Sequence, residues 1–425
     1  MNHELVEVKG VPKVEGAVDV LVRLVNEHFE VKVKAREGIR LLERLLIGKS
    51  YREIPFIVSR MCGVCPIIHN ITSVQALERA LSVTVGDEIK GVREAMTIGG
   101  HLQSHLIHLY VFTLPDIVGR KNIVEIIGEN EKMVKTVFRL KKIANTITDY
   151  LGGRAAHPIT PTVGGLTKVP SKSVIETLLR QAQLFKETLK EVLEVILAAK
   201  LPQFEEKTQY LSLKSNEFYP ILDGGLTISN EKFFEQKEYE DFITYVNEEY
   251  STARHYLLNG KPYMVGALSR VNNNYSLLSE EAKKICEVYD LKFPSHSPFM
   301  NIKAQAIEMI HLSSRLVELL EQLSSTAFKE DYVKYNVRAG EGVSITEAPR
   351  GILIHHYRVH EDGRIVEANI ITPTAQNYKS MEHTLQKYLT TIFEKDLNLI
   401  SRRVEELVRA YDPCISCSAR FLREH

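Results

Sequence analysis

Four of the five cysteines form two C-x-x-C pairs near opposite ends of the chain, Cys62 with Cys65 and Cys414 with Cys417. The two intervening residues let both thiolates point to one side of a turn, where sulfur binds zinc, nickel or iron. One such pair is equally compatible with a redox dithiol or with half of a zinc site. Two pairs favour a single soft-metal site, which requires the fold to bring the two ends of the chain together.

Polar residues surround the two pairs. Arg60, His69 and Asp412 border them, and Glu15 and Glu43 lie in the segment that leads to the first pair. A closed structural zinc site needs little besides its thiolates, whereas a polar environment is expected where protons and electrons move. The surroundings therefore favour chemistry at the metal.

The fifth cysteine, Cys286, lies in a helical pattern whose apolar face includes it. We interpret it as a small buried hydrophobic residue, which is the usual role of a free cysteine. It is therefore not expected to bind the metal.

Composition is that of an ordinary globular protein, with 44% hydrophobic and 25% charged residues among 425. The 54 Lys and Arg balance 54 Asp and Glu, so no overall field favours nucleic acid as a partner. The sequence has no apolar run of about 18 residues, and its start lacks the apolar core of a signal peptide. We therefore predict a cytoplasmic protein whose paired thiols bind metal. The absence of Trp and the abundance of Lys, Glu and Ile favour a thermophilic source.

Hydrophobic periodicity predicts a predominantly helical α+β protein, with a core of long helices and peripheral β-sheets. Along the chain we expect strands at about 4–36, helices between about 72 and 151 and at about 170–200, strands and loops at 208–275, helices near 278–290 and 302–328, a hairpin at 351–372 and a last helix at about 380–410. No linker separates the cysteine pairs. We therefore expect one interleaved domain over 1–425, divided into a β-rich segment (1–50), a mainly helical core (51–335), a second β-rich segment (336–378) and a C-terminal helix with the second motif (379–425).

The stretches RMCGVCPIIH (60–69) and DPCISCSAR (412–420) resemble the two signature motifs of the large, catalytic subunit of nickel-iron hydrogenases. Further similar stretches follow in the order of that family: KVEG (13–16), residues 43–48, SHLIHLYVFTLPD (104–116), GGRAAHP (152–158), EAPRG (347–351) and ITPTAQN (371–377). The resemblance implies the hydrogenase large-subunit fold and the reversible heterolytic cleavage of dihydrogen to protons and electrons. HLYVFTLPD is most similar to the cytoplasmic, cofactor-coupled (group 3) branch.

The resemblance also implies a ligand set. Nickel would be bound by all four paired cysteines, and an iron carrying carbon monoxide and cyanide would share two of them. By motif position, Cys62 and Cys414 would be terminal nickel ligands, and Cys65 and Cys417 would bridge the metals. Glu15 matches the acidic residue that takes the proton from terminal Cys414.

Other site residues follow from the same resemblance. Arg350, with Pro349 beside it, matches the arginine that overhangs the open coordination position, and Asp116 and Asp412 match the carboxylates that orient it. A guanidinium held by two carboxylates keeps a fixed charge and fixed donors over the reacting gas. His69 matches a histidine near a bridging cysteine.

A third metal is expected near the C-terminus. Glu43 matches a carboxylate that holds magnesium or a second iron in the family. Its usual partner is a histidine after the last cysteine, where this chain has Arg420. Charged arginine has no lone pair to offer a metal, so His425 would have to complete this site by folding back.

The chain keeps no cysteines for an iron-sulfur cluster, so electrons would leave through an iron-sulfur small subunit. Further flavin or iron-sulfur subunits would carry them to NAD(P), a deazaflavin, ferredoxin or a similar carrier. The resemblance also implies a maturation endopeptidase and nickel-insertion proteins as partners.

Two alternative functions stay open. A structural zinc or redox-dithiol protein leaves Glu15 and Arg350 unexplained, and a nickel-free relative from a respiratory complex would lack the thiolates that this chain has.

Overall fold

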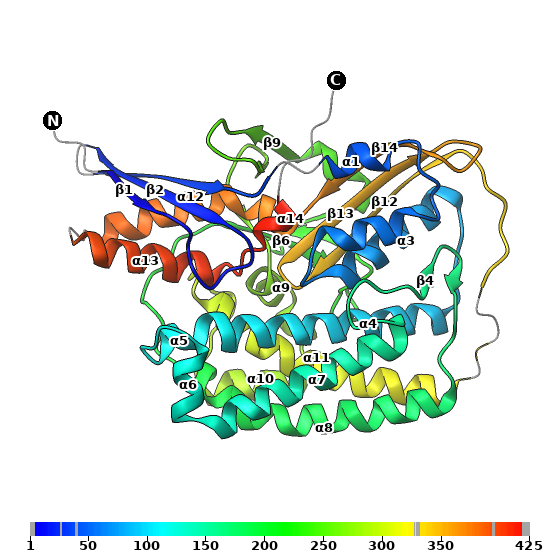
Figure 1. Ribbon diagram of the computed structural model, residues 1–425, viewed down its shortest axis with the longest axis horizontal. Helices are drawn as coiled ribbons and strands as arrows, with labels where there is room; N and C mark the ends of the chain where they lie inside the picture. Colours follow the sequence, from blue (N-terminus) through cyan, green and yellow to red (C-terminus); the bar gives the residue numbers. More distant parts are fainter. Residues whose placement is uncertain are drawn as a thin grey trace.

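The computed structural model describes residues 5–25, 28–38, 41–326, 328, 332–392 and 396–418. Figure 1 shows a lower layer of long helices and an upper layer in which β-sheets lie with further helices. This architecture confirms the predicted α+β class. Within the described ranges, no helix combines the length and the apolar character needed to cross a lipid bilayer.

The N-terminal sheet consists of three antiparallel strands, with β2 in the middle. Along the third strand, Phe29, Val31 and Val33 are buried and alternate with exposed residues, which places one face of the sheet on the core. Helix α12 packs against this strand. The alternation in the sequence correctly predicted these strands, which are β1 (Leu5–Val8), β2 (Val18–Val25) and β3 (His28–Ala35).

The lower layer is built from α4 (Asp87–Leu106), α7 (Glu131–Gly152), α8 (Lys172–Leu197) and α11 (Met300–Ser325). Helices α4 and α8 each pack against α7 and α11. Asn130 and Ser171 accept hydrogen bonds from backbone N–H groups of the first turns of α7 and α8. Gly153, at φ +74°, ends α7 in the left-handed conformation. The predicted long helices are thus present with recognisable caps.

Helix α4 continues into a π-helical segment before it reaches Asp116. The sequence predicted a helix here but not the change in winding. Such segments are rare and often occur at functional sites. This one brings His108 to Arg409, with 2.7 Å between Nε2 and the carbonyl oxygen. The elements are η2 (Ile107–Thr113), α5 (Leu114–Ile117) and α6 (Ile123–Glu129).

A three-stranded antiparallel sheet forms from β12 (Gly340–Ala348), β13 (Gly351–Val359) and β14 (Ile365–Ile371), as the predicted hairpin requires. Helix α3 (Pro66–Leu81) packs closely on it. A Cβ atom at Gly342 would lie 2.2 Å from the carbonyl oxygen of Ala76, so only glycine permits this approach. The two-residue connection between β12 and β13 is Pro349 and Arg350.

The middle of the chain forms the sheet β11-β6-β7-β8 and the pair β10-β9, as predicted for 208–275, but the helix α9 (Ala267–Asn274) at the end of this range was not predicted. The remaining elements are α1 (Leu42–Leu46), α2 (Ile54–Val58), η1 (Ser59–Met61), β4 (Pro161–Thr162), β5 (Gly165–Leu166), β6 (Gln209–Lys214), β7 (Gly225–Ile228), β8 (Lys232–Phe234), η3 (Gln236–Asp241), β9 (Ile243–Asn247), β10 (Arg254–Leu258), β11 (Tyr263–Met264), α9 (Ala267–Asn274), η4 (Tyr275–Leu277) and α10 (Glu280–Val288).

The prediction of one last helix at about 380–410 is wrong. Two helices, α12 (Pro373–Ile392) and α13 (Leu397–Ala410), occupy this region, and the short α14 (Ile415–Ser418) follows. Asp396 caps α13, since its side chain accepts hydrogen bonds from two backbone N–H groups of the first turn. Helix α13 then delivers Asp412 and the second cysteine pair.

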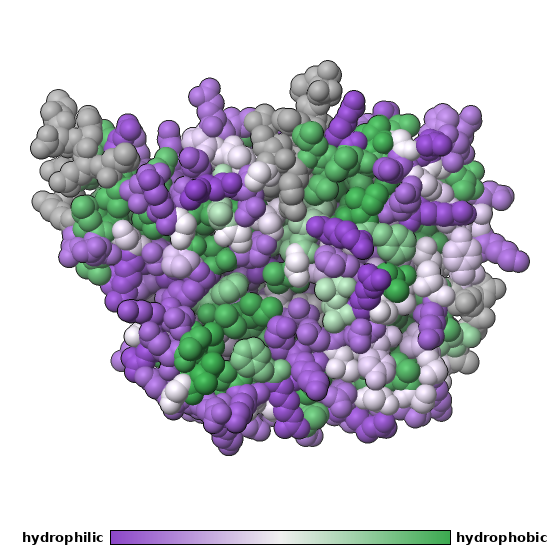
Figure 2. All heavy atoms as spheres, viewed as in Figure 1, coloured by the Kyte–Doolittle hydropathy of each residue, from purple (hydrophilic) through white to green (hydrophobic). Residues whose placement is uncertain are grey.

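The surface in Figure 2 is mainly hydrophilic, with apolar residues gathered over α5 and α6 and around α1. Val124 of α6 is 68% exposed, and Leu45 of α1 is 57% exposed. Gathered apolar surface of this kind is typical of contact with another protein.

Candidate metal centre

The four paired cysteines converge in one place, which we call the thiol cluster (Cys62, Cys65, Cys414 and Cys417). Their Sγ atoms all lie within 4.8 Å of one another. Cys62 Sγ is 3.4 Å from Cys414 Sγ, and Cys65 Sγ is 3.7 Å from Cys417 Sγ. Among the described residues, no other group of three or more Cys, His, Asp and Glu side chains is close enough to hold an ion.

The first pair is positioned by the start of α3. Cys65 is the N-cap residue, and Pro66 begins the helix, where its fixed φ is favourable. The backbone N–H groups of Val64 and Cys65 donate to Cys62 Sγ at 3.3 and 3.1 Å. Amide donors and the positive end of a helix both stabilise negative charge on sulfur.

The second pair is held by the N-terminal segment. Glu15 and Cys414 form an isolated parallel bridge, in which the N–H of Ile415 donates to the carbonyl of Glu15 at 2.8 Å. Gly16 has φ +84°, and a Cβ atom there would lie 2.8 Å from Ile415 Cβ. Only glycine therefore allows the two segments to approach this closely. The N–H of Cys414 also donates to Thr374 Oγ1 at 2.9 Å.

Glu15 directly contacts a thiol of the cluster. Cys414 Sγ donates to Glu15 Oε2 at 3.0 Å, the N–H of Ser416 donates to the same oxygen at 3.2 Å, and the Ser416 hydroxyl donates to Oε1. Burial, with a further contribution from Cys414, raises the pKa of the Glu15 carboxyl to about 7. The carboxylate is thus placed to take a proton from sulfur.

Arg350 is a buried cation beside the thiol cluster, only 4% exposed. Its Nε donates to the carbonyl of Asp412 at 2.7 Å, Nη2 donates to Asp412 Oδ1 at 2.8 Å, and Nη1 donates to Ser104 Oγ at 3.2 Å. Burial opposes the charge, but Asp412 and three of the thiols outweigh it and raise the pKa of Arg350 above its ordinary value. The guanidinium is therefore charged and fixed.

The positive charge of Arg350 helps to lower the pKa of the Cys62 thiol. Burial alone would raise the pKa of the Cys62 thiol, yet hydrogen bonds with the other three thiols and the charge of Arg350 hold it well below its ordinary value. Cys62 therefore favours thiolate, the form that binds metals, whereas burial and the neighbouring thiols raise the pKa of Cys417, and the neighbouring thiols with burial raise that of Cys65. Four converging sulfurs of this kind fit nickel and iron, which are expected here.

Asp116 does not orient Arg350, contrary to the prediction. Its carboxylate accepts instead from Lys13 Nζ and, at 2.5 Å, from Arg409 Nε. The side chains that Arg350 contacts are those of Asp412 and Ser104. Asp412, in contrast, lies beside Arg350 as expected.

His69 lies on α3, one turn after Cys65, and is buried. Its Nδ1 is 3.1 Å from His355 Nε2, and His355 Nδ1 is 2.6 Å from the Tyr357 hydroxyl. Burial, together with His69, holds the pKa of His355 well below its ordinary value, so His355 is neutral. These hydrogen bonds fix the ring of His69, which is consistent with a supporting position.

Only the Glu43 part of the expected third-metal site lies among the described residues, so this site stays a prediction. Its Oε1 accepts from the N–H of Ile370 at 2.7 Å, and its Oε2 lies 3.8 Å from Arg254 Nη1. A guanidinium this close repels a metal cation and cannot bind one. The other residues considered for this metal, Arg420 and His425, lie outside the described residues.

The sequence did not single out Ser104, Thr374 or Ser416, whose side chains bind Arg350, Cys414 and Glu15, respectively. Ser416 was detectable, because a hydroxyl between two metal-binding cysteines lies near both. Thr374 and Ser104 lie within stretches that resemble the hydrogenase family, but nothing in their own spacing marks them.

Comparisons with known proteins agree with this geometry. The family of nickel-dependent hydrogenases matches residues 40–139 and 223–420, which include both cysteine pairs. Sulfhydrogenase 1 subunit alpha of Pyrococcus furiosus is 34% identical, over 97% of this chain and 97% of that protein. Sulfhydrogenase 2 subunit alpha of the same organism is 32% identical, over 99% of this chain and 100% of that protein. The structure of an NAD+-reducing NiFe-hydrogenase in the H2-reduced state has the same fold, with a TM-score of 0.87 at 23% identity, covering 98% of this chain and 99% of the other.

Proposed function

Because this chain belongs to the nickel-dependent hydrogenase family, as a large subunit, we propose that its thiol cluster holds nickel and an iron that carries carbon monoxide and cyanide. One observation carries this proposal: four thiols converge with a carboxylate on one of them and a buried guanidinium beside them. When bound, the metals would supply the heterolytic cleavage of dihydrogen to protons and electrons. A closed zinc site would need neither the carboxylate nor the guanidinium.

Within the cluster we assign Cys62 and Cys414 to nickel alone and Cys65 and Cys417 to both metals. The contact between Cys414 Sγ and Glu15 supports this assignment, because a thiolate that binds one metal is more basic than one that binds two and therefore accepts a proton more readily. Glu15 Oε2, 3.0 Å from that sulfur, would take the proton and pass it toward solvent. Proton transfer needs hydrogen-bond distance, and this pair has it.

Arg350 would hold its positive charge and its N–H donors in a fixed place beside the reacting position. Its two bonds to Asp412 hold the planar guanidinium in one orientation. Pro349 fixes the turn on which it lies, and His69 would support Cys65 from the next turn of α3.

Electrons must leave through another protein. The only cysteine outside the cluster is Cys286, which is buried in α10. An iron-sulfur small subunit is therefore the proposed first acceptor, followed by flavin or iron-sulfur subunits and a soluble carrier such as NAD(P), a deazaflavin or ferredoxin. The apolar surfaces over α5 and α6 and around α1 are available for such contacts. A cytoplasmic location and the maturation partners stay predictions.

The test is to purify the native complex with all its subunits. Nickel analysis, infrared spectroscopy and dihydrogen oxidation with a dye acceptor should show stoichiometric nickel, bands of iron-bound carbon monoxide and cyanide, and turnover. Zinc in place of nickel, or the absence of those bands, would refute the proposal and favour a structural zinc or redox-dithiol protein. The co-purified subunits would identify the carrier.

A further inference from the structure

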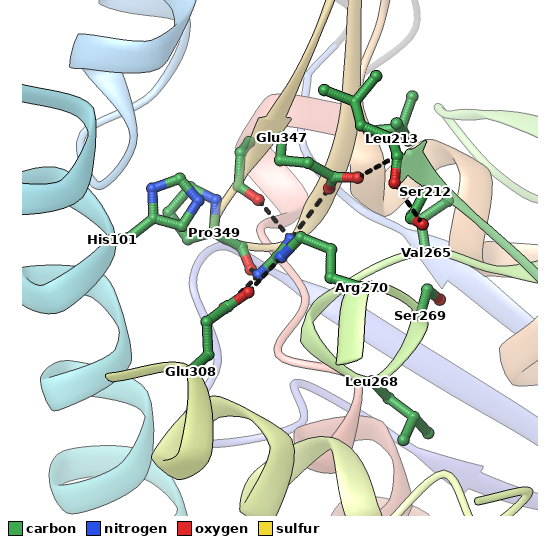
Figure 3. Close-up of polar contacts among 12 residues, drawn as sticks. His101, Ser212, Leu213, Val265, Leu268, Ser269, Arg270, Glu308, Glu347 and Pro349 are labelled. Carbon is green, nitrogen blue, oxygen red and sulfur yellow. Dashed lines mark hydrogen bonds and ion pairs between the residues drawn. The ribbon is translucent and has the colours of Figure 1, made fainter. Parts of the chain in front are cut away.

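Arg270 is a fully buried arginine of α9 that binds none of the four thiols in the described contacts. Its Nε and Nη2 donate to Glu308 at 2.6 Å each, and Nη1 donates to Glu347 Oε2 at 3.1 Å. Nη1 also donates to the carbonyl of Ala348 at 2.9 Å, and Nη2 donates to the carbonyl of Pro349 at 3.0 Å (Figure 3). All five N–H donors of the guanidinium are therefore in use.

The two carbonyls belong to the residues that immediately precede Arg350. The next residue, Gly351, has φ +125°, and a Cβ atom there would lie 2.6 Å from Val265 Cβ. The tip of the hairpin thus lies directly on the segment that leads into α9. Because Arg270 ties the same tip by two hydrogen bonds, the backbone of Arg350 cannot shift without breaking them.

A second connection runs through Glu308. Besides Arg270, this carboxylate contacts His105 Nε2 at 2.8 Å and accepts from the Tyr219 hydroxyl at 2.7 Å. His105 is the neighbour of Ser104 on α4, and Ser104 accepts from Arg350. Arg270 and Glu308 therefore fix both the turn that carries Arg350 and the helix that supplies one of its acceptors.

The electrostatics require an arginine here. Burial opposes the charge of Arg270, but Glu308 and Glu347 outweigh it and raise the pKa of Arg270 above its ordinary value. Lysine would keep the charge, but its three donors cannot bind two carboxylates and two carbonyls in the same plane. Arg270→Lys therefore removes the planar set of hydrogen bonds and keeps the positive charge.

We propose that Arg270 is a positioning residue for the reaction, which holds the Pro349 and Arg350 turn in place and thereby fixes the Arg350 guanidinium beside the thiol cluster. Arg270 contacts no reacting atom and acts through Arg350. The kinetic part of this inference rests on the proposed function, whereas the structural part does not.

Arg93 offers a matched control on the same protein. It is equally buried and binds Glu78 through two bonds of 2.8 Å. It also donates to two backbone carbonyls, those of Thr162 at 3.0 Å and Gly165 at 3.1 Å. None of these partners belongs to the thiol cluster or to the Arg350 turn. Arg93→Lys therefore carries a similar structural cost without the proposed effect.

The experiment compares Arg270→Lys and Arg93→Lys in the purified native complex. We expect the kcat per nickel to fall about 100-fold in Arg270→Lys, because a small misplacement of an active-site group typically costs about that much. In Arg93→Lys the kcat per nickel should stay near that of the parent. Thermal midpoints should fall similarly in both. In an Arg350→Lys background, Arg270→Lys should cause no further loss of kcat, since both changes disturb the same group. Crystal structures should show that Arg350 leaves Asp412 only in Arg270→Lys.

An unchanged kcat in Arg270→Lys, an equal loss in Arg93→Lys, or Arg350 still bonded to Asp412 in the Arg270→Lys structure would each overturn the proposal. If Arg270→Lys fails to assemble, Glu347→Gln removes the charge from one partner of Arg270 and is compared in the same way. An inactive parent complex would refute the proposed function, while the crystal structures would still decide whether Arg270 positions Arg350.

Discussion

Replacement of Glu15 by glutamine tests the proposed proton transfer most directly. Glutamine keeps the size of the side chain, its oxygen can accept from the Ser416 N–H, and its NH2 group can donate to the Ser416 hydroxyl oxygen, but it takes no proton from Cys414. Loss of a positioned proton acceptor lowers turnover by about 10²- to 10⁴-fold, which corresponds to about 3–5 kcal/mol of activation free energy. The free energy of unfolding should change by less than about 1 kcal/mol, because both contacts with Ser416 can be kept once the hydroxyl accepts instead of donates.

The assay is dihydrogen oxidation with a dye acceptor, normalised to the nickel content of the purified complex. Glu37→Gln is the matched control, because Glu37 Oε1 accepts from the backbone of Ala17 at 3.0 Å in the same segment. It should keep both turnover and nickel. Turnover near that of the parent in Glu15→Gln would refute the reasoning. Loss of nickel from this variant would also refute it, because it would make Glu15 a structural residue.

Three further predictions concern metal binding and pH. Cys417→Ser should lose nickel, whereas Cys286→Ala should keep it and cost about 1–2 kcal/mol of stability; metal analysis that finds nickel in the first variant would contradict this. Glu43→Gln should leave the content of every metal unchanged, because the charge of the neighbouring Arg254 opposes a metal cation at that carboxylate; loss of magnesium or iron would show that the site exists. Burial lowers the pKa of His311 from 6.5 to about 4, so its contribution to stability is complete above pH 6.5 and is lost as the pH falls toward 4. Between pH 8 and pH 5, the parent should therefore lose about 2 kcal/mol more than His311→Asn in denaturant titrations, and equal losses would exclude this effect.

Strongly periodic segments were predictable because one face of each is buried. The β13 and β14 hairpin follows from alternation around a turn in which Gly363 has φ +84°. The break before α13 was missed because the helical pattern continues on both sides, although Asp396 is a good N-cap residue. The π-helical η2 was missed because it shifts the register of a helix without changing its composition.

The site was predictable only in part. The types and spacing of Cys62 and Cys414 indicate a metal, and family resemblance placed Glu15 and Arg350 near them. Their roles stay predictions, although the structure brings them together. Asp116 was assigned to Arg350 by motif position, but side chains from distant segments bind it instead. Arg270 had no local signal at all, because its five bonds join residues that only the fold brings together.

The convergence of the two cysteine pairs also affects the whole chain. Cys62 and Cys414 are 352 positions apart, so metal held by both pairs would join the two ends of the polypeptide. Closing a loop of that length lowers the entropy of the unfolded chain by an amount worth roughly 6 kcal/mol at 25 °C. This is similar to the net stability of a typical domain, about 5–15 kcal/mol. The same ions that would react with dihydrogen would thus also cross-link the chain, and removing them should lower the temperature at which the entire chain unfolds.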